Sequence, residues 1–344
     1  MQSVYVSGAA SSFSWADDRS SLTDLIFECV KAVHADAATS VADVDAVVLA
    51  AHDLVDGRGL TNMVTAPAAG TYLKDETRLG DDGATAFILG DARVRSGSVR
   101  RCVVVAWGRA SEGPADRIAN ALFDPFTTGA LGMTEVAVSG MRAAMAIASH
   151  PSYGEQRDGA ARARRAAADP SRQPAAAWPL RANELPVWAD VVAAVVLSSE
   201  PSPVEVRGVG MSTEPYDIGD RDLLALPALR QASARALRQA GIGIGEVDVF
   251  ELDGLSLFDD ALAVEAVGAA PSGQGMRALA DGLPVNTGGG SSAGYCAPAM
   301  GLVRIVAAYQ RLLREGGGFA LATGSSVVAS QTQAAVVLSH RPAR

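Results

Sequence analysis

Apolar residues recur at helical spacing near the start of the chain. They fall at i, i+3, i+4, i+7, i+8 and i+11 and so share one helix face, on Leu22, Leu25, Ile26, Cys29, Val30 and Val33. Ser20 or Ser21 suits the N-cap of this helix. A polar break follows, and the mostly apolar run 44–49 then predicts a buried strand.

The same order of helix and strand returns near residue 227. A second apolar stripe predicts a helix that ends at Gly241, on Leu229, Ala232, Ala236, Leu237 and Ala240. A strand over 247–252 follows it. The phrases Asp43-Val44-Asp45-Ala46-Val47 and Glu246-Val247-Asp248-Val249-Phe250 take the same place in the two copies.

A further helix and strand follow each of these units. The first half predicts a helix over 83–95 and a strand over 102–106, and the second half a helix over 300–314 and a strand over 319–322. Internal duplication constrains the whole fold. Alternating helices and strands favour mostly parallel sheets covered by helices, so the fold class is α/β.

The chain between the two copies has a different composition. We expect residues 1–110 together with 186–200 to form the N-terminal half, and 201–344 to form the C-terminal half. The segment 111–185 then reads as a helical and loop insertion that leads into a strand over 191–197. Its basic residues form either a solvated helix face or a docking site for a phosphate-rich ligand or an acidic partner, on Arg162, Arg164, Arg165 and Arg172.

Composition excludes several classes of function. A formal net charge of −9 argues against non-specific nucleic-acid binding. No apolar run approaches the roughly 18 residues of a membrane span, and the N-terminus reads as a strand, so we expect a cytoplasmic protein. The three cysteines and four histidines are scattered along the chain, which predicts neither a metal site nor disulfides.

Two α/β halves with an irregular insertion resemble the layout of the thiolase superfamily. In the second half, Leu283-Pro284-Val285-Asn286-Thr287-Gly288-Gly289-Gly290, then Gly294-Tyr295-Cys296 and a helix, resemble the family's Asn-x-x-Gly-Gly stretch and Gly-His-Pro turn. Glu251-Leu252-Asp253-Gly254-Leu255-Ser256 resembles its Glu-Leu-His-Asp-Ala-Phe segment. Ala263-Val264-Glu265-Ala266-Val267-Gly268 resembles the Glu-x-Leu-Gly that follows.

In the first half, Asp190-Val191-Val192-Ala193-Ala194-Val195 resembles the family's Asp-Gly-Ala-x-Ala-Val strand entry. The order and spacing of these motifs are similar to the branch of sterol-carrier-protein thiolases, thiolase-fold aldolases and ketosynthase-like proteins. The resemblance implies the thiolase fold, a duplicated five-layer α-β-α-β-α architecture.

The chain has no cysteine where the resemblance places the nucleophile. A thiolase activates its thiol at a helix N-terminus, in Cys-x-Ser/Thr-Gly. The matching residues are Gly80-Asp81-Asp82-Gly83, so Gly80 takes the nucleophile's place without a side chain. Asp81 and Asp82 suit the start of a helix better than a role as nucleophile.

The other catalytic positions also depart from the family. The histidine of Gly-His-Pro aligns with Tyr295, and the polar residue of the Glu-Leu-His-Asp segment with Asp253. The family's second catalytic cysteine, near the end of the sequence, aligns within Thr323–Ser330, where this chain has serines and no cysteine. Cys296 takes the family's proline position and suits packing. We expect a pocket that includes Asp82, Gly83, Asn286, Gly289, Gly290 and Ser326.

These replacements favour a subunit without thiolase chemistry of its own. We expect it to bind an acyl-CoA or a carrier-protein thioester, to need no cofactor, and to form a homodimer or a heterodimer with a thiolase or ketosynthase homologue. The resemblance also implies a small zinc-ribbon/OB-fold accessory protein as a partner.

Two alternatives remain open. The first is a cysteine-independent carbon–carbon lyase that cleaves β-hydroxyacyl-CoA by a retro-aldol step, with Tyr295 as acid/base and Asp253 as base. Thiolase-fold aldolases keep a tyrosine at the place of Tyr295 but differ at Asp253. The second is an acyl-CoA or lipid carrier. Structurally, Tyr295 also suits a buried hydroxyl that satisfies a loop carbonyl, and Asp253 a turn cap.

Overall fold

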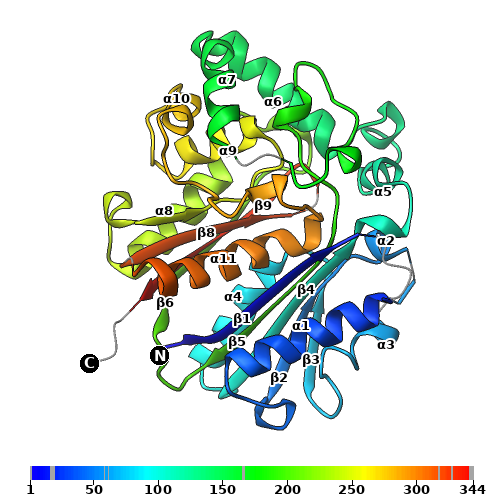
Figure 1. Cartoon of the computed structure of the whole chain (residues 1–344), viewed down its shortest axis with the longest axis vertical. Coiled ribbons are helices and arrows are strands. Elements are labelled where there is room, and N and C mark those ends of the chain that lie inside the picture. The colour runs from blue at the N-terminus through cyan, green and yellow to red at the C-terminus, as the bar shows by residue number, and fades with distance from the viewer. Residues whose placement is uncertain are drawn as a thin grey trace.

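The computed structural model describes residues 2–15, 20–57, 59–60, 62–164, 167–316, 318–326 and 328–340 (Figure 1). Nine strands join into one sheet of order β3-β2-β4-β5-β1-β6-β9-β8-β7. Their bounds are β1 Tyr5–Ser14, β2 Ala46–Ala50, β3 Asp75–Leu79, β4 Arg101–Arg109, β5 Asp190–Ser198, β6 Val204–Thr213, β7 Val249–Glu251, β8 Phe319–Ser325 and β9 Thr332–His340.

The strand order repeats within the sheet. The N-terminal strands run β2-β4-β5-β1 and the C-terminal strands run β7-β8-β9-β6, which is the same pattern in the two halves. The halves join where Tyr5 of β1 pairs with Glu205 of β6. In the first half β3 pairs in parallel with β2, and in the second half Val285 makes one parallel bridge to Phe250. The duplication predicted from the helix and strand pattern therefore extends to this short remnant of an edge strand.

Helices lie outside the two groups of strands and between them. Their bounds are α1 Leu22–Asp36, α2 Asp53–Asp56, α3 Asn62–Thr65, α4 Gly83–Arg95, α5 Ala115–Ala121, α6 Glu135–Ser149, α7 Ser152–Ala163, α8 Pro227–Ala240, α9 Leu257–Ala266, α10 Gly275–Ala280 and α11 Met300–Glu315. Helix α4 has the bounds expected from the sequence.

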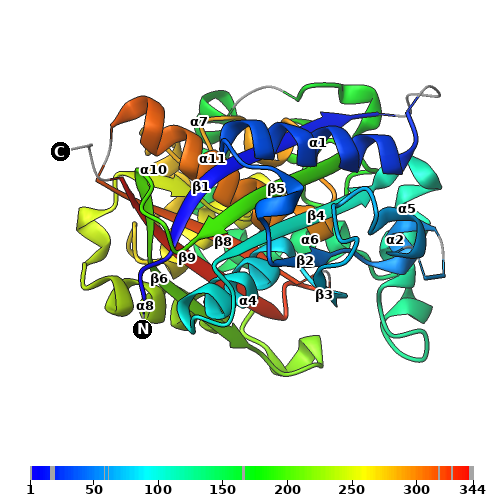
Figure 2. The same cartoon turned by 90° about the horizontal axis from the view of Figure 1, so that it is seen from below.

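Five layers result from this arrangement. Helix α1 packs on β1 and β5, and α8 packs on β6 and β9 (Figure 2). Helices α4 and α11 pack on each other, and each also contacts strands of both halves. The order α-β-α-β-α agrees with the architecture that the resemblance implies.

The central strands are buried on both faces, which explains their continuous apolar sequence. In β2, Ala46, Val48 and Ala50 belong to the core around α4, whereas Val47 and Leu49 belong to the core under α1. Successive strand residues point to opposite faces. Strands covered by helices on both sides therefore carry apolar residues at every position.

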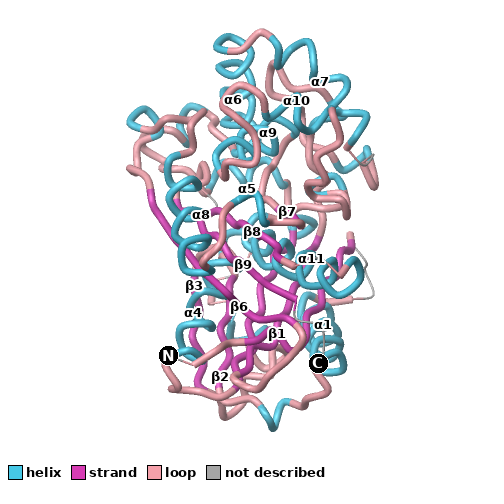
Figure 3. Tube along the Cα trace, turned by 90° about the vertical axis from the view of Figure 1, so that its left-hand side faces the viewer, coloured by secondary structure: helices cyan, strands magenta, loops and turns pink. Residues whose placement is uncertain are grey.

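The segment 111–185 contains α5, α6 and α7 together with short 3₁₀ turns and loops. Helices α6 and α7 gather with α9 and α10 at one end of the molecule, at the top of Figure 3. A buried ion pair fastens the insertion: Arg157 Nε donates to Glu184 Oε1 at 2.7 Å, and the Arg157 guanidinium lies over the Phe258 ring at 5.2 Å.

The basic residues of this insertion do not form one solvated face, contrary to the simpler expectation. The Arg164 side chain is only 8% exposed and lies 3.8 Å from the carboxylate of Asp260. Arg172 pairs with Asp169 and stacks on Trp15. Arg162 is exposed, and Arg165 lies outside the described residues. The buried carboxylate draws Arg164 inward because a buried charge requires a partner.

Within the described residues, no helix combines the length and the apolar character that crossing a membrane requires.

Candidate functional site

Asp82 caps the two central helices at once. As the N-cap of α4 it accepts a hydrogen bond on Oδ1 from Ala84 N at 2.8 Å, and Oδ2 accepts one from Gly301 N, in the first turn of α11, at 2.9 Å. A side chain at Gly301 or at Gly324 would collide with this carboxylate. Burial, and then the nearby Asp253, raise the pKa of Asp82 well above its ordinary value.

Gly80 stands two residues before this cap, at the start of the turn into α4. An added Cβ there would meet open space within 4 Å. Packing therefore does not force a glycine at this position. Gly83, in contrast, is packed so closely against Leu302 and Ala106 that it has no room for a side chain.

Asp253 follows directly after β7 and is held from two sides. Its backbone N–H donates to Thr323 Oγ1 at 2.8 Å, and Oδ2 accepts a hydrogen bond from Ser325 Oγ at 2.7 Å. The other oxygen, Oδ1, is buried and has no hydrogen-bond partner within the described part of the chain. Burial raises the pKa of Asp253, and Arg304 and Ser325 act in the opposite direction. Asp253 thus keeps one carboxyl oxygen free in a position shielded from water.

Tyr295 lies between a polar cavity and an apolar cavity and lines both. Its ring packs against Trp188 with centroids 5.9 Å apart, and its carbonyl accepts a hydrogen bond from Ala189 N at 3.2 Å. Burial, followed by the charges of Asp253 and Glu135, raises the pKa of Tyr295 well above its ordinary value. The phenol is therefore neutral at physiological pH and suits hydrogen-bond donation.

The polar cavity has a volume of about 20 Å³, enough for about one water molecule. Besides Tyr295, its walls carry carboxyls, guanidinium groups and hydroxyls, from Glu135, Arg142, Asp253, Asp259, Ser325, Ser326 and Ser330. The apolar cavity has a volume of about 50 Å³ and is lined mainly by Val55, Ala110, Ala115, Ile118, Ala119, Leu122, Trp188, Cys296 and Ala297.

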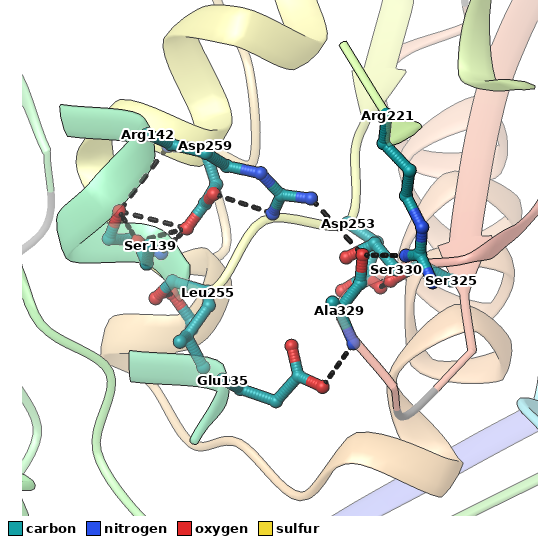
Figure 4. A network of polar contacts seen from close by, with 12 residues as sticks. Glu135, Ser139, Arg142, Arg221, Asp253, Leu255, Asp259, Ser325, Ala329 and Ser330 are labelled. Atoms are coloured by element: carbon teal, nitrogen blue, oxygen red, sulfur yellow. Dashed lines mark hydrogen bonds and ion pairs between the residues drawn. The ribbon is translucent and has the colours of Figure 1, made fainter. Parts of the chain in front are cut away.

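Glu135 is a site residue that the sequence did not single out. It is the first residue of α6, and its Oε1 accepts a hydrogen bond from Ala329 N at 2.6 Å (Figure 4). Burial raises the pKa of Glu135 to about 8, opposed by the Ala329 N–H and by Arg142. An acidic residue after Thr134 reads as ordinary helix-start chemistry, so no sequence signal marked it.

A buried polar network supports the loop that follows β8. Arg142 pairs with Asp259 at 3.1 Å, and Arg142 Nη2 donates to the carbonyl of Ala329 at 3.3 Å. Arg221 Nη1 donates to the same carbonyl at 3.1 Å. Ala329 and Ser330 have φ values of 49° and 54°, an unfavourable left-handed conformation for residues with side chains. These hydrogen bonds hold the strained loop against the cavity.

The residues expected in one pocket separate into three places. Asp253, Tyr295 and Ser326 line the polar cavity, together with Ser325 and Ser330. Asp82 is fully buried and lies with Gly83 between the central helices. Asn286, Gly289 and Gly290 line another cavity, of about 360 Å³, beside Arg164 and Asp260.

The side-chain amide of Asn286 is fully engaged in hydrogen bonds with the neighbouring chain. Its amide donates to Leu252 O at 2.9 Å and accepts from Leu252 N at 2.8 Å, which fixes the turn that leads to Asp253. Its φ of 51° explains why asparagine, which tolerates this conformation, stands there. In this structure Asn286 positions the neighbouring strand end.

All three cysteines are buried and free. Burial raises the pKa of Cys29 and of Cys102 to about 12, and that of Cys296 well above its ordinary value. Cys296 packs closely against Gly108 and forms part of the apolar wall. A thiol that stays protonated is a poor nucleophile. The groups suited to chemistry at this site are therefore Asp253, Glu135 and Tyr295.

Comparisons with known proteins agree with the fold. Residues 210–340 match the family described as thiolase C-terminal domain-like. A solved structure of an Ltp2-ChsH2(DUF35) aldolase aligns over 100% of this chain and 99% of its own, with a TM-score of 0.77 and 19% sequence identity. At that identity the likeness shows the fold alone.

Two curated relatives match part of the chain. The benzoylsuccinyl-CoA thiolase subunit BbsB of Thauera aromatica is 26% identical over 147 residues, and the match covers 38% of each chain. An acetyl-CoA acetyltransferase of Methanothermobacter thermautotrophicus is 28% identical over 155 residues, 40% of each chain. The chain thus spans about two fifths of the length of the curated relatives it matches. Residues 210–340 thus resemble the thiolase C-terminal domain, and the chain as a whole shares the fold of the aldolase structure.

Proposed function

We propose that this chain is a cysteine-independent carbon–carbon lyase that cleaves a β-hydroxyacyl thioester by a retro-aldol step. The observation that carries the proposal is the free, buried Oδ1 of Asp253 beside Tyr295. Burying a carboxyl oxygen without a partner costs stability, and a subunit that serves only as a scaffold gains nothing from it. Buried titratable groups around a cavity are typical of sites that move protons.

The roles of the two groups follow from their surroundings. Asp253 takes the proton of the β-hydroxyl on Oδ1 while Ser325 holds Oδ2. The bond between Cα and Cβ breaks, a carbonyl forms at Cβ, and the electron pair passes into the thioester enolate. The neutral hydroxyl of Tyr295 donates a hydrogen bond to the enolate oxygen, where charge develops. The step needs no thiol and no oxidant.

The adjoining cavities suit such a substrate. The reacting side chains line the polar cavity, and the apolar cavity on the other side of Tyr295 suits hydrocarbon. With volumes of about 20 Å³ and 50 Å³ the cavities are too small for a whole β-hydroxyacyl group, so binding requires α5, which lines the apolar cavity, to move outward.

The test is the release of a carbonyl compound from defined thioesters. The purified chain, alone and with any subunit that co-purifies, is incubated with 3-hydroxybutyryl-CoA and with 3-hydroxy-3-phenylpropionyl-CoA, and the aldehyde and the shortened acyl-CoA are measured. Tyr295→Phe and Asp253→Asn should each lower kcat by about 100-fold or more. Tyr153→Phe, which removes another buried hydroxyl remote from both cavities, is the matched control.

Iodoacetamide should leave the activity unchanged, because the three thiols are buried. Absence of cleavage with both thioesters, or full activity of Tyr295→Phe, would contradict the proposal.

A second candidate is a non-catalytic acyl-thioester-binding subunit that pairs with a thiolase or ketosynthase homologue. Beside the edge strand β3, the described part of segment 54–73 exposes large apolar side chains, among them Tyr72 at 78% and Leu73 at 86%. An exposed apolar patch beside an open strand edge is typical of a protein interface. The similarity to a thiolase subunit supports this reading.

The two candidates differ in what Leu73→Glu does. If this face binds a partner, the variant should run as a smaller species in size-exclusion chromatography with light scattering. Leu313→Glu, an exposed leucine at the end of α11, is the control. An unchanged mass for Leu73→Glu would exclude this face as the interface.

A further inference from the structure

Glu135 occupies the junction of the two cavities. It lines the polar cavity and the apolar cavity, and among the described residues Tyr295 is the other one that lines both. An acyl thioester with its reacting atoms in the polar cavity and its hydrocarbon in the apolar cavity must pass this junction. Glu135 therefore lies beside the reacting carbon atoms, the α-carbon among them, where the acyl chain passes from one cavity to the other.

We propose that Glu135 is the acid that delivers a proton to the α-carbon after the carbon–carbon bond has broken. The inference rests on the proposed lyase function and supplies the step that Asp253 and Tyr295 leave open. The O–H bond of the Glu135 carboxyl breaks, a C–H bond forms at Cα, and the enolate returns to a neutral thioester. Asp253 leaves the cycle protonated and Glu135 ionised, so one proton passing between them through water restores both.

The surroundings of Glu135 suit a group that donates a proton and then carries charge. Its pKa is raised to about 8, so the carboxyl is protonated at neutral pH. Once the proton has left, the hydrogen bond from Ala329 N, at 2.6 Å, and the charge of Arg142 stabilise the carboxylate. The charged groups that face it are Arg142, Asp253 and Asp259.

The other carboxyls of the site are less suited to this role. The Asp259 carboxylate already accepts hydrogen bonds from Arg142, from Ser139 at 2.5 Å and from Ser256 at 2.9 Å. Asp82 is occupied by the two backbone N–H groups that it caps and lies deeper than the cavity wall. Asp253 already serves as base.

The strained loop at Ala329 and Ser330 orients the backbone N–H that donates a hydrogen bond to the Glu135 carboxylate. Arg142 and Arg221 both donate hydrogen bonds to the Ala329 carbonyl, which restrains the peptide bond between Ala329 and Ser330. The left-handed conformation of Ala329 and Ser330 directs the Ala329 N–H toward Glu135. The strained conformation thus has a function at the site, because it orients the N–H that stabilises the Glu135 carboxylate.

The experiment follows exchange of the α-hydrogens of a product thioester, which requires Glu135 but not cleavage. Acetyl-CoA, the thioester product of both test substrates, is incubated in D₂O with the wild-type chain and with Glu135→Gln, Glu135→Asp and the exposed control Glu155→Gln, and deuterium at the α-carbon is measured by mass spectrometry. Wild type and Glu155→Gln should exchange at equal rates. Glu135→Gln should exchange about 100-fold more slowly, and Glu135→Asp should recover part of the rate.

The pH profile separates proton transfer from a structural role. Exchange begins with the Glu135 carboxylate, so the wild-type rate should rise with pH through about 8, and Glu135→Gln should lack this rise. If Glu135→Gln exchanges at the wild-type rate while the chain still cleaves 3-hydroxyacyl-CoA, the inference is overturned and the lyase function stands. If the wild type neither cleaves nor exchanges, the lyase function fails, and the inference fails with it.

Discussion

Asp82 Oδ2 accepts the backbone N–H of Gly301 at 2.9 Å, across 219 residues of chain. The residue that begins the central helix of one half thereby caps the central helix of the other. Both helix N-termini point their partial positive charge at the same carboxylate. Asp82 thereby joins the duplicated halves through their central helices.

Replacement of Asp82 by alanine should destabilise the whole chain. Two buried backbone N–H groups lose their acceptor, at about 1–3 kcal/mol each. We expect a loss of about 2–4 kcal/mol in the free energy of unfolding, measured by denaturant titration. Asp116→Ala, at an exposed position of α5, should change it by less than about 0.5 kcal/mol. Equal stabilities of the two variants would show that the shared cap contributes nothing.

Gly301 should accept no side chain. A Cβ at this position would overlap the Asp82 carboxylate and approach Ala84, so Gly301→Ala must break the shared cap or push the two helices apart. We expect a cost of about 2 kcal/mol or more. The matched control is Gly245→Ala, where the added Cβ meets open space. Thermal unfolding of the two variants side by side measures the difference.

A cysteine introduced at Gly80 should react with thiol reagents although the native cysteines do not. The position has open space for a side chain and lies at the entry to α4, whereas the native thiols are buried with raised pKa values. At pH 8, iodoacetamide should label Gly80→Cys once per chain and leave the wild type unlabelled, as seen by intact mass.

Even so, Gly80→Cys should not gain thiolytic activity toward acetoacetyl-CoA. The residues that the sequence resemblance places at the family's activating histidine and second cysteine are Tyr295 and serines, which do not activate a thiol. Thiolytic turnover by this single variant would contradict the importance we give to those two replacements.

Glu135→Gln should change how stability depends on pH. The pKa of Glu135 is about 8 in the folded chain, against 4.5 as its ordinary value, so the native state holds this proton more tightly. Its contribution is fully present below pH 4.5 and is lost as pH rises to about 8. The variant cannot ionise and avoids this loss.

Relative to the wild type, Glu135→Gln should therefore gain at least about 1 kcal/mol in stability between pH 5 and pH 9. Urea titrations at the two pH values measure the difference, with Glu155→Gln as the control. A constant offset between variant and wild type at both pH values would place the pKa of Glu135 near its ordinary range.

The framework of the fold could be predicted because its signals are local. The apolar stripe on α1 and α8 and the continuous apolar strands follow from short segments, and their repetition revealed the two halves. The cap at Asp82 could be predicted as a helix start. Its second oxygen could not, because the partner N–H belongs to the other half.

The site was harder to predict because its parts meet only after folding. Glu135 contacts Ala329 across 194 residues, and both lie in segments without a motif. Tyr295 and Asp253 were accessible to prediction because they replace residues of a resembling motif. Asn286 was grouped with them for the same reason, yet its amide turns toward Leu252, because that strand end requires a hydrogen-bond partner.

The two ends of the sheet differ in a way that limits assembly. At one end, β3 is a five-residue strand that pairs with β2 alone among the described strands; at the other, Val285 makes one bridge before Asn286 turns the chain away. Within the described residues, β3 is thus the edge along which another strand can be added. Two chains that join along β3 would pair the β3 edge of one chain with that of the other. Neither β3 strand would then keep a row of unpaired backbone N–H groups that could bind a third chain. Assembly by this route ends at a closed pair instead of growing into a fibre.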